Sequence, residues 1–358
     1  MKENEALVSA ILPVYNVDQY LRAAVQSLVN QTYTNIEIII VNDGSTDKSQ
    51  EVGEKLQSEF SNVTLVNQKN AGAAAARNHG MNKAQGKYFY FMDPDDEMQG
   101  DYIQQMVSVA EKAQAELVIA GFTNVYESAG RRETTVVRSE EHIYQTQTEF
   151  RKDAVRLLNN TQLAVPWNKL YLATYLVQNQ ITFPSVKWDD LHFNLEVIRN
   201  IQRVALADTC GYQFLRVRPG SETTTVFSDA LFANRKLQYT HAQEVFSSWK
   251  LHDEIVDGQL AYYFISRTFQ VIQEITRNNE LSHKQKNEKI KAILTDLLVR
   301  SEAEKCQIAN PLMKIVLHPV IIGSVSQSRN MGSLVSIAQN KFSRVFRSLR
   351  VKIMKVTQ

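Results

Sequence analysis

The 358-residue sequence contains only two cysteines, Cys210 and Cys306, which is too few for a disulfide framework and matches no zinc-site spacing. It lacks a run of about 18 uninterrupted apolar residues, as a membrane span needs; the nearest candidate, residues 315–325, is broken by His318 and Pro319. The acidic start of the chain does not resemble a secretory signal peptide. With 40 basic and 38 acidic residues, no net field favours nucleic acid. These absences predict a globular protein of a reducing, cytoplasmic compartment.

Two common nucleotide-binding motifs are also missing. No Gly-x-Gly-x-x-Gly pattern follows a predicted strand. Residues 80–88 partly match the phosphate-binding P-loop pattern. However, the spacing from Gly80 to Gly86 is one residue too long, and no serine or threonine follows Lys87. A site for a nucleotide, if the chain has one, must therefore be built in another way.

Five short apolar runs within the first 121 residues predict strands, because stretches with helical periodicity separate them. The runs are Leu7–Val14, Ile36–Val41, Val63–Val66, Tyr88–Met92 and Leu117–Gly121. Strands that are apolar throughout are typical of a mostly parallel sheet with helices on both faces, so the predicted fold class is α/β. Ligands of such sheets bind beyond the carboxyl ends of the strands, which makes the residues directly after each run the first candidates for a site.

The remainder of the chain changes character twice. Residues 122–147 are β-branched and charged, which predicts antiparallel strands or a long excursion, and helices are predicted at 150–158, 169–178 and 191–200. Beyond Gly220, residues 231–278 and 282–301 show helical periodicity without strand signals. The predicted organisation is an α/β domain over 1–225 with halves 1–121 and 122–225, a helical extension over 226–310, and a basic amphipathic tail over 311–358.

Three carboxylates, Asp93, Asp95 and Asp96, follow the fourth apolar run within four residues. Such a cluster repels itself unless a cation lies among its members. Oxygen ligands on a loop suit Mg²⁺ or Mn²⁺, which takes one or two protein carboxylates together with substrate phosphates. The alternative is a solvated turn in which Asp96 caps the next helix. The position of the cluster at the carboxyl edge of the sheet favours the metal site.

A fourth carboxylate, Asp43, follows the second apolar run. It can accept hydrogen bonds from a ligand, and Gly44 beside it allows a close approach. The alternative is that the segment only begins the next helix, with Ser45 or Asp47 as its cap. Both interpretations remain open at the level of the sequence.

An alanine-rich segment, residues 70–80, lies between these two acidic segments. Its Arg77 can bind phosphate through the two-pronged guanidinium group. The small residues equally suit tight packing of a helix on the sheet. For His79 the sequence favours a packing or hydrogen-bonding role over a catalytic one.

The order of these segments resembles that of family 2 glycosyltransferases of the GT-A fold. The similar pieces are Pro13-Val14-Tyr15-Asn16, Val41 to Asp47, Asn70 to Gly80, and Phe91 to Asp96. Each piece is weak alone, but four in the same order are specific. In the second half, Val165–Tyr171 is similar to a Trp-Asn-Lys-Leu-Tyr segment of bacterial polysaccharide members, and Phe183–Phe193 resembles the segment that carries the catalytic base. Residues 216–221 resemble a later segment that closes over the diphosphate, so the resemblance covers residues 7–225.

The resemblance implies a Rossmann-like GT-A domain with a C-terminal helical extension and a role for each matched residue. On the donor side it places Pro13, Tyr15, Asp43 (nucleobase), Arg77, Asp93 (ribose), Asp95 (metal and diphosphate) and Asp96 (donor sugar or metal). On the acceptor or diphosphate side it places Trp167, Lys169, Asp189, Arg218 and Ser221. The implied metal ligand is Asp95 and the implied cofactor is Mn²⁺ or Mg²⁺.

The resemblance also implies that Asp190 is the catalytic base, which removes a proton from the acceptor hydroxyl. The family has glutamate where this chain has Asp189, a change that keeps the charge but shortens the reach. The alternative is that Asp189 and Asp190 only cap the helix that begins directly after them. A cap position also holds a carboxylate in a defined place, so the two interpretations are compatible.

The expected function is that of an inverting glycosyltransferase in cell-surface polysaccharide assembly. Such an enzyme moves a sugar from a nucleoside-diphosphate sugar to a saccharide or lipid-linked acceptor, and the resemblance to the family implies a UDP-sugar as the donor. One alternative is a nucleotidyltransferase resembling sugar-nucleotide pyrophosphorylases, although a glycine-rich basic N-terminal loop is absent. The others are a non-catalytic carbohydrate-binding or scaffold protein and a membrane-associated assembly protein that acts through its helical tail.

The end of the chain is basic and amphipathic. After residue 340 the sequence has six cations and no acid, and without them the formal charge would fall from +2 to −4. Apolar residues recur among them at three- and four-residue steps, from Phe342 to Val356. This pattern is typical of an interfacial membrane helix, although a helix packed on protein is the alternative. The tail therefore predicts peripheral contact of residues 341–358 with anionic lipid at the inner face of the cell membrane.

Overall fold

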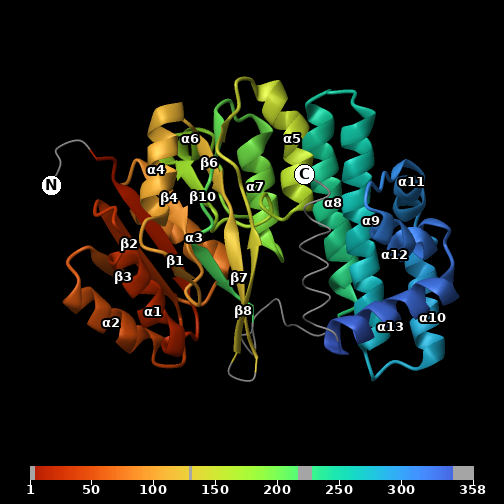
Figure 1. Cartoon of the computed structure of the whole chain (residues 1–358). Coiled ribbons are helices and arrows are strands. Elements are labelled where there is room, and N and C mark those ends of the chain that lie inside the picture. The colour runs from red at the N-terminus through yellow and green to blue at the C-terminus, as the bar shows by residue number, and fades with distance from the viewer. Residues whose placement is uncertain (1–4, 129–130, 217–227, 342–358) are drawn as a thin grey trace. The chain divides into compact units, whose positions relative to one another are not determined.

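The computed structural model describes residues 5–128, 131–216 and 228–341. The chain forms two compact units, which are called here the sheet unit and the helical unit. The sheet unit consists of Met1–Arg151 and Thr161–Val217, and the helical unit consists of Lys152–Asn160 and Arg218–Gln358. Figure 1 labels the elements of both.

The sheet unit alternates strands and helices through its first half, as the sequence predicts. In chain order its elements are β1 Val8–Val14, α1 Asp18–Val29, β2 Ile36–Asp43, α2 Ser49–Glu59, β3 Val63–Gln68, α3 Ala73–Lys83, β4 Tyr88–Phe91, β5 Glu97–Met98, α4 Tyr102–Ala113 and β6 Leu117–Ala120. The second half contains β7 Phe122–Ser128, β8 Arg131–Val137, β9 His142–Ile143, α5 Gln147–Asn159, β10 Lys169–Leu172, α6 Ala173–Gln178, α7 Asp189–Arg199, β11 Val204–Ala207 and β12 Tyr212–Leu215. From Lys152 onward, α5 belongs to the helical unit.

The main sheet has eight strands in the order β3-β2-β1-β4-β10-β6-β11-β9. The first four strands of this order pair in parallel, as do β6 and β11. Every residue of β1 and β4 is buried, which explains why these strands are apolar throughout. The predicted α/β class with a mostly parallel sheet is confirmed. The strand order reverses at β1 and β4, so their carboxyl ends mark the position where such sheets bind ligands.

One predicted helix begins with a strand. The sequence predicts a helix over 169–178, but Lys169–Leu172 form β10, which pairs antiparallel with both β4 and β6, and only Ala173–Gln178 are helical. The helix prediction for these four residues is wrong because Lys-Leu-Tyr-Leu is too short to show a period. Its pairing partners lie about 50 to 80 residues earlier in the chain, and local propensity carries no information about them.

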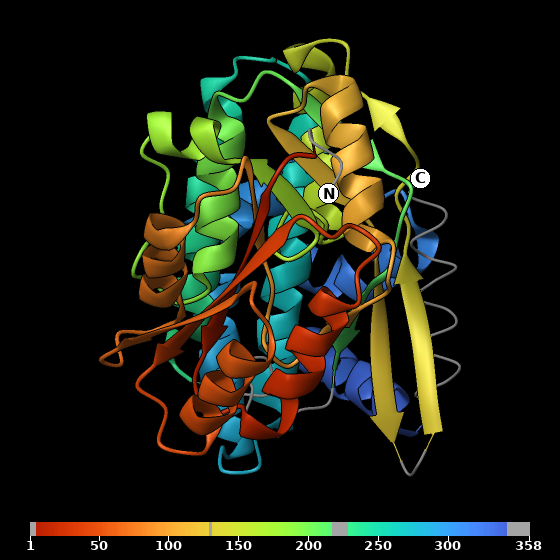
Figure 2. The same cartoon turned by 90° about the vertical axis from the view of Figure 1, so that its left-hand side faces the viewer.

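The antiparallel strands predicted for residues 122–147 are present. β7 and β8 pair along their length as a hairpin, which Figure 2 shows side-on. They belong to a second, four-stranded sheet in the order β5-β12-β7-β8. This small sheet joins β5, directly after the acidic cluster, to β12, which begins at Tyr212.

Helix α3 packs closely on the main sheet. A Cβ atom built on Gly80 would overlap the Cγ2 atom of Ile11 in β1 and lie 3.3 Å from Cγ2 of Val41. The tight helix-on-sheet packing considered for the alanine-rich segment is therefore present. This packing also places Arg77, one turn earlier on α3, near the carboxyl ends of the central strands.

Substitution of Gly80 with alanine is expected to destabilise the protein by about 1–3 kcal/mol, because the extra methyl group overpacks the contact between α3 and β1. Urea unfolding of the full chain measures this change. The matched control is Gly100→Ala, whose added Cβ would lie 3.5 Å from its nearest neighbour, the carbonyl oxygen of Asn30, and which should change stability by at most about 0.5 kcal/mol. Equal stability of the two variants would contradict the overpacking.

The helical unit is built around α9, Glu254–Arg277. The other helices are α8 Ala230–Ser248, α10 His283–Leu294, α11 Leu297–Lys305, α12 Pro311–Ile321 and α13 Val325–Lys341. Each of them packs on α9, as Figure 1 illustrates for α8. The periodic stretch over 231–278 thus forms two helices, and Lys250 and His252, which have positive φ angles, lie in the connection between them.

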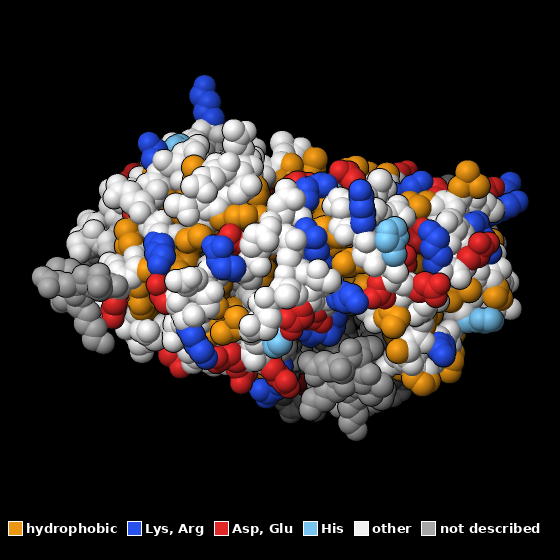
Figure 3. Space-filling view, turned by 90° about the horizontal axis from the view of Figure 1, so that it is seen from above, with side chains coloured by type: hydrophobic (Ala, Val, Ile, Leu, Met, Phe, Trp, Pro, Cys, Tyr) orange, Lys and Arg blue, Asp and Glu red, His pale blue; other side chains and the backbone are white. Residues whose placement is uncertain are grey.

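Among the helices that the structure describes, none combines the length and apolar character needed to cross a membrane. On the face drawn in Figure 3, lysine and arginine side chains are interspersed with aspartate and glutamate side chains, in keeping with the small net charge. The basic tail lies outside the described residues from Phe342 onward.

Candidate active site

Polar groups at the carboxyl ends of β1 and β2 tie the two strands together. Pro13 is buried in β1 opposite Val41, whereas Tyr15, just beyond the strand, has 47% of its surface exposed. The Oδ1 atom of Asn16 accepts hydrogen bonds from the backbone N–H of Thr46 at 2.8 Å and of Asp47 at 3.3 Å. The predicted donor-side residues Pro13 and Tyr15 therefore lie at the expected edge, with only Tyr15 open to solvent.

Asp43 ends β2 and is almost fully buried. Its Oδ1 atom accepts hydrogen bonds from Gln68 Nε2 and from the N–H of Ala71, and its Oδ2 atom accepts one from the N–H of Gly72, each at 2.8 Å. The neighbouring Gly44 has φ +68°, and a Cβ there would lie 2.9 Å from the backbone nitrogen of Asn70. Asp43 thus holds the loop before α3 in place, and its contact with a nucleobase stays a prediction.

The hydrogen bonds of Asp43 reveal a residue that the sequence analysis missed. Gln68 donates to Asp43 through Nε2, and its Oε1 atom lies 2.8 Å from His79 Nδ1. This chain of contacts confirms the hydrogen-bonding role predicted for His79. Gln68 is the last residue of β3, so its place at the end of a strand was the signal available in the sequence.

Arg77 is the centre of an ion-pair cluster. Its Nη2 atom lies 3.1 Å from Asp93 Oδ1, and its Nη1 atom lies 3.2 Å from Asp189 Oδ2 and 3.1 Å from Asp190 Oδ1. The guanidinium group also lies over the Phe183 ring, 5.1 Å from its centroid. The structure therefore brings together three predicted segments that are up to 113 residues apart: α3, the acidic loop after β4, and the start of α7.

The electrostatics of the cluster follow from its burial. Burial disfavours the charged guanidinium of Arg77, but the carboxylates of Asp190, Asp93 and Asp189 outweigh this effect and raise its pKa. Burial raises the pKa of Asp93 to about 7, Arg77 opposes the shift, and Asp190 and Asp95 add to it. Three carboxylates face one guanidinium, so the fully ionised cluster has an excess of negative charge that a bound cation would stabilise.

The last carboxylate of the acidic loop points into the protein. Asp96 is 1% exposed, and its two oxygens accept hydrogen bonds from Tyr212 Oη at 2.6 Å and from the N–H of Leu215 at 2.8 Å. Burial, together with Asp93 and Asp95, raises its pKa well above the usual range. Asp96 therefore connects the loop to β12 and does not cap a helix. A contact with the donor sugar stays a prediction.

Trp167 and Lys169 lie in the interior of the sheet unit. The Trp167 ring stacks on Tyr212 with centroids 4.4 Å apart and an interplanar angle of 8°. The ammonium group of Lys169 donates to the carbonyl oxygens of Gln162 at 2.5 Å and Val165, and to Asn168 Oδ1 at 2.9 Å. Burial lowers the pKa of Lys169 well below its usual range. These contacts fix the loop before β10, and contact with an acceptor or a diphosphate remains a prediction for both residues.

Asp189 and Asp190 are the first two residues of α7, after Trp188, whose φ of +58° is left-handed. Acidic residues suit the first turn of a helix because of its dipole. The Asp190 side chain is 31% exposed and that of Asp189 is 13% exposed, so Asp190 is the more accessible of the two. Asn194 Nδ2 donates to the Asp190 carbonyl at 2.9 Å and fixes the turn. Arg218 and Ser221 lie outside the described residues.

The residues at this edge fit a divalent cation held mainly by its substrate. Within the part of the chain that the structure describes, no three histidine, cysteine, aspartate or glutamate side chains gather as a metal-binding group. Both oxygens of Asp96 are engaged, and Asp93 pairs with Arg77. Asp95, between them on the loop, is partly buried, and its role as a metal ligand stays a prediction. One carboxylate together with diphosphate oxygens is a common ligand set for Mg²⁺ and Mn²⁺.

The order of the main sheet and the acidic loop at its carboxyl edge define an α/β domain of the GT-A class. The chain matches residues 1–349 of TarS from S. aureus, solved in complex with UDP-GlcNAc, with a TM-score of 0.66. The match covers 91% of this chain and 90% of that one at 19% identity, and it concerns the fold. The GT-A fold with C-terminal helices, as the resemblance implied, is confirmed.

The chain belongs to glycosyl transferase family 2. The sequence profile of this family matches residues 9–176. The chain is 31% identical over 239 residues to the uncharacterized glycosyltransferase EpsJ of Bacillus subtilis. This alignment covers 65% of this chain and 67% of EpsJ. It is also 31% identical over 217 residues to the glycosyltransferase GlyA of Streptococcus pneumoniae, which covers 60% of this chain but only 31% of GlyA. The chain therefore matches about a third of the length of GlyA.

Proposed function

We propose that this chain is an inverting glycosyltransferase, which transfers a sugar from a UDP-sugar to a hydroxyl group of a saccharide or lipid-linked acceptor in polysaccharide biosynthesis. The observation that carries the proposal is the Arg77 cluster, which joins the acidic loop after β4 to Asp190 at the edge where α/β sheets bind ligands. Family membership supports the reaction class. The complexes of TarS with UDP-GlcNAc and with UDP support uridine as the nucleoside.

In the proposed reaction, the oxygen of the acceptor hydroxyl attacks the anomeric carbon of the donor sugar. Asp190 accepts the proton that this hydroxyl loses. The bond from that carbon to the diphosphate breaks, the configuration inverts, and UDP leaves with the electron pair. Arg77 holds Asp190 and Asp93 in fixed places, so the base and the donor side keep a defined separation. Asp95 is the proposed ligand of Mn²⁺ or Mg²⁺, which when bound neutralises the diphosphate charge.

The alternatives are less well supported. A nucleotidyltransferase resembling sugar-nucleotide pyrophosphorylases would need a glycine-rich basic loop near the N-terminus, and the sequence after β1 reads Tyr-Asn-Val-Asp. A non-catalytic binding or assembly protein would not need three acidic residues grouped around one buried arginine at a sheet edge. Membership of a glycosyltransferase family favours transfer over both.

A screen of nucleotide sugars tests the proposal. Full-length protein with Mn²⁺ is incubated with UDP-, GDP- and dTDP-sugars, with and without a mixture of saccharide acceptors, and the free nucleoside diphosphate is measured. We expect release of UDP that rises when an acceptor is added. Turnover that depends on pyrophosphate would favour the nucleotidyltransferase. Donor binding without any turnover would favour a non-catalytic protein.

We also propose that residues 341–358 hold the protein reversibly at the cytoplasmic face of an anionic membrane. Each cation near such a surface contributes about 1 kcal/mol, and the segment has six without a compensating acid. Deletion of residues 341–358 is therefore expected to lower binding to phosphatidylglycerol vesicles at low salt, with UDP release from the donor unchanged. Co-sedimentation measures the binding. Equal sedimentation of the deleted and full-length proteins would contradict the proposal.

A further inference from the structure

Helices α12 and α13 carry an unusual number of exposed apolar side chains. Ile315 and Leu334 are 61% and 62% exposed, and Leu312, Ile322 and Ile337 are also exposed. These five are nearly half of the large hydrophobic side chains that are exposed among the residues that the structure describes, yet they lie within 26 residues of sequence. Contiguous apolar surface of this kind marks an interaction site more often than chance exposure.

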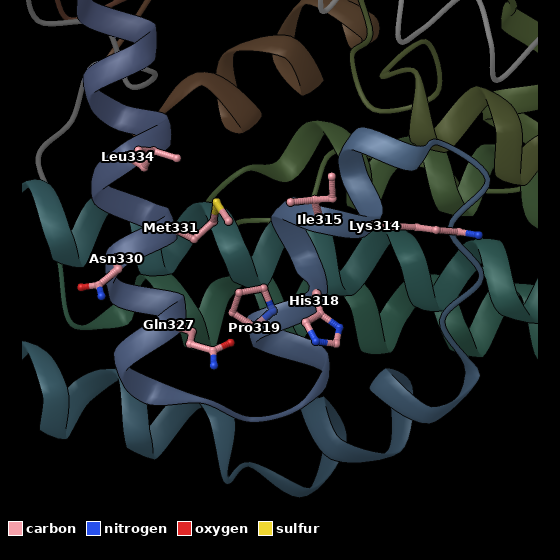
Figure 4. Close-up of a pocket in the computed structure, with 8 residues that line it drawn as sticks. All are labelled: Lys314, Ile315, His318, Pro319, Gln327, Asn330, Met331 and Leu334. Carbon is pink, nitrogen blue, oxygen red and sulfur yellow. The ribbon is translucent and has the colours of Figure 1, made fainter.

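Two of these residues, Ile315 and Leu334, line a groove of about 650 Å³ between the two helices. α12 contributes Lys314, Ile315, His318 and Pro319, and α13 contributes Gln327, Asn330, Met331 and Leu334. In Figure 4 the side chains of Ile315, Met331 and Leu334 face the space between the helices, whereas Lys314 extends away from it. The lining of the groove thus combines apolar side chains from both helices with the polar Gln327 and Asn330 and the basic Lys314 and His318.

This apolar face is not the face that builds the helical unit. The opposite sides of the two helices are packed, with Leu317 and Val320 of α12 and Val335 of α13 buried. Arg277 of α9 donates from Nε to Ser336 Oγ at 3.1 Å, which fixes α13 on the core. The helices therefore have one apolar side that stabilises the fold and a second that the described residues leave uncovered.

The charged residues of α12 and α13 themselves have one sign. The two helices contain Lys314, Arg329 and Lys341 and no aspartate or glutamate. Lys314 and His318 are exposed on the rim of the groove itself. Elsewhere the two signs are interspersed, as on the face in Figure 3. Two helices that carry basic residues and exposed aliphatic side chains are complementary to anionic headgroups above acyl chains.

We propose that the outer face of α12 and α13 docks on an anionic lipid surface, with Ile315 and Leu334 entering the boundary between headgroups and acyl chains. A second copy of the chain fits less well, because a two-fold contact of this face with itself would bring like charges together. The contribution of this face is apolar and therefore resists salt. It differs in this from the electrostatic contribution proposed for residues 341–358. The proposal does not depend on the sugar-transfer reaction.

The test compares two pairs of exposed residues in the full-length protein. The docking variant carries Ile315→Glu and Leu334→Glu, and the matched control carries Ile255→Glu and Leu297→Glu, whose side chains are 62% and 86% exposed on α9 and α11. Binding to vesicles of phosphatidylglycerol and phosphatidylcholine, or of phosphatidylcholine alone, is measured by co-sedimentation at low and high salt. Light scattering without lipid gives the oligomeric state, and thermal unfolding and UDP binding verify the fold.

We expect the docking variant to bind anionic vesicles at least about tenfold more weakly than wild type, with the loss persisting at high salt and the control within about twofold of wild type. The proposal would be overturned if the wild-type protein did not bind anionic vesicles, or if a folded docking variant bound them as tightly as wild type. A dimer of the wild type that the docking variant loses would instead assign the face to self-association. If the glutamate pair prevents folding, Ile315→Ser with Leu334→Ser repeats the comparison.

Discussion

Substitution of Asp190 with asparagine is expected to lower the rate of sugar transfer by about 10²–10⁴-fold, the usual range for loss of a general base. The reason is that the amide cannot accept the proton of the acceptor hydroxyl. Arg77 keeps Asp93 and Asp189 as ion-pair partners in the variant, so the cluster and the start of α7 should persist. Donor affinity, measured by calorimetry with UDP, should remain within a few fold, and the rate of UDP release in the presence of acceptor should report the loss.

The matched control for this experiment is Asp189→Asn. Asp189 contacts the same Arg77 Nη1 atom but is less exposed than its neighbour. If proximity to Arg77 alone mattered, both variants would lose activity equally. A much smaller loss for Asp189→Asn separates the base from the ion pair, and near wild-type turnover by Asp190→Asn would show that Asp190 only stabilises the helix start.

Substitution of Asp95 with alanine is expected to weaken Mn²⁺-dependent UDP binding by at least about 10–100-fold, since even residues that only support a metal ligand have effects of this size. The side chain lies on the loop between β4 and β5 and is partly exposed, so its removal should leave the fold intact. Calorimetric titration with UDP, in the presence of Mn²⁺ or of a chelator, measures the metal-dependent part of the affinity. Thermal unfolding verifies that the variant is folded.

Asp101→Ala is the matched control for Asp95→Ala. It removes an exposed acidic side chain a few residues further along, which accepts a local hydrogen bond from Gln105 Nε2 at 2.6 Å. Its UDP affinity should equal that of wild type with and without metal. Undiminished Mn²⁺-dependent binding by Asp95→Ala would remove Asp95 from the metal site and turn attention to Asp93.

Arg77 connects the two segments that these predictions concern, the acidic loop after β4 and the start of α7. Arg77 was predicted to bind phosphate, yet its described contacts are with carboxylates on both sides of the site. A buried arginine that is shared by Asp93 and Asp190 couples the donor loop to the base. Loss of one carboxylate leaves Arg77 paired with the other two, whereas loss of Arg77 removes an ion pair from each of Asp93, Asp189 and Asp190. Because burial makes an unpaired charge costly, the second change should perturb the cluster more.

Much of the sheet unit followed from the sequence by itself. The apolar runs at Leu7–Val14, Ile36–Val41 and Tyr88–Met92 are long enough to show that both faces of each strand are buried, and helices between them imply parallel pairing. The acidic residues after Phe91 could be placed at the carboxyl edge for the same reason. These features are local, and local patterns of polarity determine them.

Only the tertiary structure decided what each carboxylate faces. Asp96 turns inward to Tyr212 while Asp93, three residues earlier, turns to Arg77, and no periodicity distinguishes them. Likewise, Lys169–Leu172 became a central antiparallel strand because β4 and β6 leave a place between them, and the apolar outer side of α12 and α13 became recognisable only once their packed side was known. Pairings between segments 50 to 120 residues apart depend on the whole packed arrangement, in which burial and charge neutralisation select among partners that the local sequence leaves equivalent.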